Sequence, residues 1–159
     1  MLKLYKVIDG MLHYHEAWVN GSELIEHWGI AGEQGETRTY AVDRSKSDDD
    51  NVRAALKERA EYGYQPIDPE GQHTLLIEYL VVGMGTKADL AKRHRLEDRM
   101  NDTLGWTGLG NCDGGSIGSG SMEVCCYVVD FDLAKRAIAK DLENTEFADY
   151  SRIYDENAV

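Results

Sequence analysis

The chain has 159 residues, of which 42% are apolar and 29% charged, and only two are proline. This composition is typical of a folded, soluble chain and excludes an intrinsically disordered one. The net charge of −12 at pH 7 argues against nucleic acid as a partner, because gripping a phosphate backbone needs a cationic face. No apolar run approaches the ~20 residues of a membrane helix, and MLKLYKVIDG lacks the basic head and apolar stretch of a signal peptide, so we expect a cytoplasmic protein without membrane contact.

The acidic excess is spread evenly along the chain. Residues 1–70 hold 8 basic and 14 acidic side chains, and residues 71–159 hold 9 and 15. A negative field of this kind repels nucleic acid and steers basic partners toward a protein. The same charge also favours solubility, so the net charge fits a protein that steers basic partners and equally one that is merely soluble.

The first forty residues predict an antiparallel meander of four strands. Asp9-Gly10 and Asn20-Gly21 are type I′ hairpin signals, since both central positions of that turn need a positive φ. They separate LKLYKVI, MLHYHEAWV and SELIEHWGI. A longer glycine-containing loop, residues 31–35, then precedes ETRTYAV.

A helix is predicted over NVRAALKERAEY. The acidic segment Ser47–Asp50 precedes it, and carboxylates in a first turn stabilise a helix through capping and the helix dipole. Gly63 stands where a C′ glycine ends a helix. The residues expected close to one apolar face are Val52, Ala55, Leu56 and Tyr62.

QPIDPEGQ contains both prolines and predicts a domain boundary. We expect a first domain over residues 1–66, a linker over 67–72 and a second domain over 73–159.

The second half predicts a β-α-β-β-α-β order. HTLLIEYLVVG and SMEVCCYVVD are typical of buried strands. Thr86 and Asp89 match a capping box that opens a helix, and Asp130 can cap FDLAKRAIAKDLENTE. With an edge strand inside residues 108–119 and a short last strand in YSRIYDE, the arrangement is ferredoxin-like. The fold class is therefore α+β in both halves.

The glycine-rich segment LGNCDGGSIGSGSME could suggest a nucleotide loop. A phosphate cradle must lead into a helix, however, and here Ser121 leads into a strand with no following lysine. We predict a hairpin with Asp113 in its turn. Contact of its exposed backbone with a small ligand or a partner stays open.

Histidines and cysteines predict no catalytic or metal site. His13 and His15 share one strand face, where we expect exposed polar residues, and two ligands do not make a zinc site. Cys125 and Cys126 point to opposite faces of their strand and no C-x-x-C pair exists, so we expect reduced structural thiols. We expect no catalytic residues, no metal and no cofactor.

The first half resembles a WGR domain. The resemblance rests on the meander, Trp28-Gly29, the G-x-x-G of Gly32 to Gly35, Thr37, and a helix that ends at Gly63-Tyr64. It implies a small β-sheet domain with a helix packed on it. In poly(ADP-ribose) polymerases such domains contact DNA ends and neighbouring domains, which makes Trp28 a contact candidate.

This chain departs from that family at the third motif position. Ile30 stands where the family has arginine, and Arg38 is the nearest replacement cation. The departure removes a cation that would serve a nucleic-acid or domain interface.

Three functions follow as hypotheses. The first is a non-enzymatic, acidic protein-binding module of inhibitor or bacterial immunity-protein (antitoxin) type that neutralises a basic partner, such as a toxin or an enzyme. The second is a WGR-type nucleic-acid-associated protein, and the third binds a small ligand at residues 109–121. We expect a monomer or a homodimer, because edge strands in either half can pair. The expected partner contacts are Trp28, Glu33, Glu36, Arg38 and Asp113.

Overall fold

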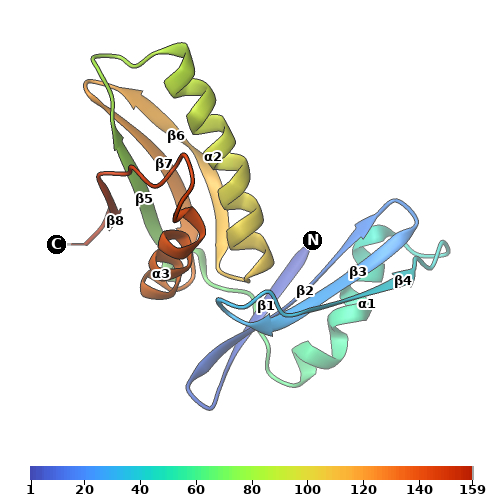
Figure 1. Ribbon diagram of the computed structural model, residues 1–159. Coiled ribbons are helices and arrows are strands. Elements are labelled where there is room, and N and C mark those ends of the chain that lie inside the picture. The colour runs from blue at the N-terminus through green and yellow to red at the C-terminus, as the bar shows by residue number, and fades with distance from the viewer. Residues whose placement is uncertain (159) are drawn as a thin grey trace. The chain divides into compact units, whose positions relative to one another are not determined.

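The computed structural model describes residues 1–158 and divides into two compact units, Met1–Pro69 and Glu70–Val159. Each unit has its own antiparallel sheet of four strands, which confirms the α+β class (Figure 1). Among the described residues, no helix combines the length and the apolar content needed to cross a membrane.

The N-terminal unit is the predicted meander followed by the predicted helix. Its sheet has the order β1-β2-β3-β4, and every neighbouring pair is antiparallel. The elements are β1 (Leu2–Ile8), β2 (Met11–Asn20), β3 (Glu23–Ile30), β4 (Glu36–Ala41) and α1 (Asp48–Glu61).

The two short hairpins use different turns. Asp9 and Gly10 both have positive φ, 51° and 79°, as the predicted type I′ turn requires. In the second hairpin Asn20 still belongs to β2, and the two-residue turn is Gly21-Ser22. There Gly21, with φ 63°, has the positive φ and Ser22 does not, which is the type II′ pattern. The turn therefore lies one residue later than predicted.

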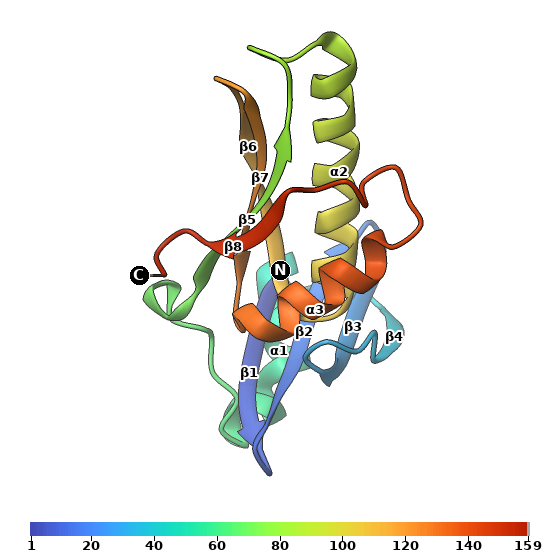
Figure 2. The same ribbon diagram turned by 60° about the vertical axis from the view of Figure 1, so that its left-hand side comes forward.

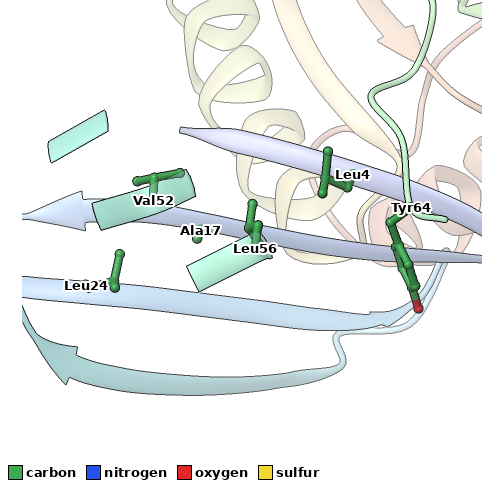
Figure 3. Packing of buried hydrophobic residues seen from close by; sticks show 6 residues of the cluster. All are labelled: Leu4, Ala17, Leu24, Val52, Leu56 and Tyr64. Carbon is green, nitrogen blue, oxygen red and sulfur yellow. The ribbon is translucent and has the colours of Figure 1, made fainter. Parts of the chain in front are cut away.

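Helix α1 packs on one face of the sheet. Ser47 is its N-cap and accepts a hydrogen bond from the backbone N–H of Asp50. Tyr62, expected on the apolar face, is instead 65% exposed, because the helix ends at Glu61 and Gly63 turns the chain away with φ 101°. Tyr64, two residues later, is buried instead. The core, shown in Figure 3, consists of Leu4, Ala17, Leu24, Val52, Leu56 and Tyr64.

The C-terminal unit has the ferredoxin-like arrangement. Its sheet has the order β6-β7-β5-β8 with antiparallel neighbours, and both helices cover the same face (Figure 2). Thr86 and Asp89 form the capping box, and Asp130 caps the last helix, as predicted. The elements, after a short 3₁₀ turn at Pro69–Gly71, are β5 (His73–Leu80), α2 (Lys87–Trp106), β6 (Gly110–Gly118), β7 (Ser121–Val128), α3 (Phe131–Leu142) and β8 (Arg152–Asp155).

The glycine-rich segment forms β6 and the turn that follows it. The turn residues are Ser119 and Gly120, both with positive φ. The prediction that Asp113 lies in this turn is wrong. Asp113 lies within β6, where the register shifts between Cys112 and Gly115. A β-bulge at this point takes up one extra residue of β6, and the strand continues to Gly118 before the turn.

Candidate functional site

The meander places three of the predicted contact residues on one sheet face. Trp28 lies opposite Glu36, and Glu26 lies opposite Arg38 in the register of β3 and β4. Directly opposite residues point to the same face of a sheet, so Trp28, Glu36 and Arg38 lie together. This is the face that carries α1, because Ala17 of the core is the partner of Glu26.

Trp28 is half-buried between a histidine and an arginine. The imidazole of His15 is stacked on it, with ring centroids 5.4 Å apart and an interplanar angle of 13°. The guanidinium carbon of Arg38 lies 5.7 Å from the centroid of the Trp28 ring, within the range of a cation–π contact. Trp28 is thus partly a packing residue and partly available at the surface, with Arg38 as its cation.

The prediction that His15 is an exposed polar residue is wrong, because His15 lies in the interior of the N-terminal unit. It is 2% exposed, because α1 covers this side of the sheet. Its Nε2 lies 2.5 Å from Oε1 of Glu26. Burial lowers the pKa of His15 below its ordinary value of 6.5; the contact with Glu26 opposes this shift, while Arg59 of α1 and His27 of β3 add to it.

This lowered pKa predicts a pH dependence of stability. The folded chain favours neutral His15, whereas the unfolded chain binds a proton near pH 6.5. The contribution is therefore present above 6.5 and is lost as the pH falls from 6.5 toward the folded pKa. We expect the free energy of unfolding in urea to fall between about pH 7.5 and about pH 5.5, and His15→Phe to reduce that fall. His94→Phe, at an exposed position on α2, is the control; an equal slope in wild type and His15→Phe would contradict the prediction.

A groove of about 420 Å³ runs beside this face, between α1 and the strands β3 and β4. It carries both charge signs along with apolar and aromatic surface, so it suits an extended peptide with mixed side chains better than a single small ion. The lining residues are Leu24, Glu26, Arg38, Tyr40, Ala55, Glu58 and Arg59.

Strand β4 is the open edge of this sheet. All of its residues are exposed, and within residues 1–158 no further strand pairs with its outer side. The opposite edge differs, since the Tyr5 N–H donates to the Gln65 carbonyl at 2.8 Å and the Gln65 N–H donates back at 2.9 Å. The chain after α1 therefore closes part of the β1 edge, and β4 keeps its backbone available.

The ladder identifies which backbone groups of β4 face outward. The Val42 N–H donates to the Ser22 carbonyl at 3.1 Å, just beyond the end of the β3–β4 pairing. In an antiparallel pair, hydrogen-bonded and non-hydrogen-bonded positions alternate. Counting back from Val42, Thr37, Thr39 and Ala41 direct their N–H and C=O groups away from β3.

The other face of the sheet holds a network of buried polar side chains that the sequence did not reveal. Glu16 lies between Lys3 and His27: Lys3 Nζ is 3.0 Å from Oε2, and His27 Nδ1 is 2.8 Å from Oε1. His27 Nε2 lies 2.5 Å from the carbonyl oxygen of Gln34, and the Tyr14 hydroxyl donates to the Glu33 carbonyl at 2.8 Å. These contacts hold loop 31–35 against the sheet, just before β4 begins.

The other predicted contact residues lie apart from this face. Glu33 is exposed on loop 31–35, and its backbone carbonyl, not its carboxylate, accepts the hydrogen bond from the Tyr14 hydroxyl. Asp113 is exposed on β6, in the other unit. The position of the turn could have indicated these buried polar contacts, because a turn at Gly21-Ser22 sets the register that pairs Glu16 with His27.

Comparisons of the chain with protein-family models, with curated proteins and with solved structures find no match. Its own geometry defines an α+β protein with two antiparallel sheets and, in the N-terminal unit, an open strand edge beside a charged and aromatic groove. In the part of the chain that the structure describes, no group of three or more His, Cys, Asp or Glu side chains is placed to hold a metal ion.

Proposed function

We propose that this chain is a protein-binding module of inhibitor or immunity-protein type, which binds an extended, basic segment of a partner protein along β4. The open edge of β4 carries this proposal. Exposed strand edges pair readily with an added strand, and main-chain hydrogen bonds then supply affinity for a peptide of almost any sequence. Such a module would neutralise a basic toxin or enzyme in the cytoplasm by covering its functional surface.

Selectivity for a basic segment would come from the side chains next to the edge. Glu36 is exposed on β4 itself, and Glu26 and Glu58 line the adjacent groove. Tyr40 and the exposed part of Trp28 offer aromatic surface for aliphatic or cationic side chains. The overall charge of −12 would steer a basic partner toward this site.

Proline at an outward-facing position of β4 tests this proposal. Thr39→Pro removes an N–H that makes no bond to β3, so the fold is retained while an added strand loses one hydrogen bond and meets the proline ring. We expect a basic protein from the native host to be captured by the immobilised chain. Its affinity, measured by calorimetry on the purified pair, should fall at least about tenfold with Thr39→Pro.

Thr39→Ala is the matched control, because it keeps the N–H and should bind like the wild type. The captured protein should also lose its own activity when the wild-type chain is added. Equal affinity of Thr39→Pro and Thr39→Ala would show that binding does not use the β4 edge.

A WGR-type role at nucleic-acid ends is the second candidate, and the contact of Arg38 with Trp28 favours it. This contact supplies a cation beside the tryptophan even though Ile30 replaces the motif arginine. Labelled blunt-ended duplex DNA at about 0.15 M salt distinguishes the two functions by fluorescence anisotropy. Tight binding with a steep salt dependence, abolished by Arg38→Gln, would favour the nucleic-acid role and contradict our proposal.

A further inference from the structure

Two cysteines of the C-terminal unit face each other across neighbouring strands. Cys112 of β6 and Cys126 of β7 are register partners. The Val129 N–H donates to the Leu109 carbonyl at 2.9 Å, and alternation from that pair makes Cys112 and Cys126 a non-hydrogen-bonded pair. The Cys112 N–H accordingly donates to the Asn101 side chain at 2.9 Å instead of to β7.

This position brings two thiols to the spacing that a disulfide needs. Cα atoms of a non-hydrogen-bonded antiparallel pair lie about 4.5 Å apart, and disulfides span Cα separations of about 4.4–6.8 Å. Both thiols are free, and both point into the helix-covered side of the sheet, where Cys112 is 8% exposed and Cys126 fully buried. Cys125, the neighbour of Cys126, points to the opposite face and cannot compete for Cys112.

We propose that Cys112 and Cys126 form a redox-modification site, which hydrogen peroxide converts into an intramolecular disulfide between β6 and β7. The β-bulge beside Cys112 gives the oxidant its approach. Asp113 and Gly115 are exposed there, and the ladder to β7 is interrupted between Cys112 and Gly115. Cys126 lies behind Cys112 and is reached through it.

The order of events follows from the contact between the two thiols. The hydrogen bond from the Cys126 thiol lowers the pKa of Cys112, although burial opposes this shift, and the same contact, with burial, raises the pKa of Cys126. The thiolate is the nucleophile in such chemistry, so Cys112 reacts first.

The atoms balance in two steps. The Cys112 sulfur attacks one peroxide oxygen, the O–O bond breaks, and the leaving hydroxide takes up the thiol proton as water, which leaves a sulfenic acid. The Cys126 sulfur then attacks the Cys112 sulfur, the S–O bond breaks, and the hydroxide leaves as water with the Cys126 proton. Together two thiols are oxidised, one peroxide is reduced to two waters, and no other reactant is needed.

The test treats the full chain with hydrogen peroxide and measures its intact mass. We expect a loss of two hydrogen atoms, restored by dithiothreitol, and an increase of the thermal unfolding midpoint in the oxidised form, because the bridge restricts the unfolded chain. No lysine or arginine lies between the two cysteines, but a protease specific for glutamate cuts after Glu123. Under non-reducing conditions the two resulting peptides should therefore remain joined.

Three variants make the assignment decisive. Cys125→Ser should still lose two hydrogen atoms, whereas Cys112→Ser and Cys126→Ser should not. In Cys126→Ser the first step should stop at a sulfenic acid on Cys112, which dimedone traps. The result for Cys125→Ser does not depend on altering a buried thiol, so it stands even if the other variants fold poorly. A disulfide that contains Cys125, or oxidation of Cys125→Ser without loss of two hydrogen atoms, would overturn the proposal.

Discussion

Glu16→Ala is expected to lower the free energy of unfolding by about 3–5 kcal/mol, the cost of removing one partner from a buried ion pair. The Glu16 side chain is 4% exposed and lies between Lys3 and His27. Without it, the partly exposed ammonium of Lys3 loses its counter-charge, and Nδ1 of the fully buried His27 loses its acceptor. Urea unfolding followed by circular dichroism measures the change.

Glu23→Ala is the matched control on the same sheet. Glu23 is the exposed first residue of β3, and surface substitutions of this kind usually change stability by less than about 0.5 kcal/mol. If Glu16→Ala and Glu23→Ala have the same effect, the carboxylate of Glu16 does not stabilise the fold through the contacts described above.

Gly35→Ala is expected to cost about 2–4 kcal/mol, the sum of a left-handed backbone penalty and a steric one. Gly35 has φ +68°, and a Cβ there would overlap the carbonyl oxygen of Trp28 and lie 2.7 Å from the Tyr14 hydroxyl. Backbone and a buried ring surround this position, so neither contact can relax by moving a flexible side chain. The Glu33 carbonyl should then lose the hydrogen bond from Tyr14.

Gly21→Ala separates the two parts of this cost. Gly21 has a similar φ, +63°, but nothing lies within 4 Å of a Cβ added there. It should therefore show the backbone penalty alone, about 1 kcal/mol. Equal losses at both positions in urea unfolding would show that the G-x-x-G loop tolerates a side chain at Gly35.

Both residues act on loop 31–35, which positions the start of β4. Glu16 holds His27, and His27 reaches the Gln34 carbonyl. Gly35 allows the chain to pass directly over the end of β3 near Trp28. In the proposed function, weakening either anchor would also disturb the strand edge that receives the partner.

Local sequence patterns predicted the elements well because their causes are local. Capping side chains, positive φ at glycine and alternation of apolar residues each depend on a few neighbouring residues, so Thr86 and Asp130 could be assigned as caps in advance. Alternation along a strand likewise implies that Glu36 and Arg38, two positions apart, share one face of β4. The groove beside them could not be predicted, since it requires α1 to pack across the strands.

By itself, the sequence determined the α+β class, the order of helices and strands, and the acidic surface. Only the tertiary structure decided which residues meet, because strand register depends on where a turn or bulge falls. A turn one residue later pairs His15 with Trp28 and Glu16 with His27. Without its bulge, the hairpin closed at Ser119-Gly120 would set Cys112 opposite Tyr127 and not Cys126. Beside the bulge, the Cys112 N–H donates to Asn101 of α2, a contact that no local pattern within β6 reveals.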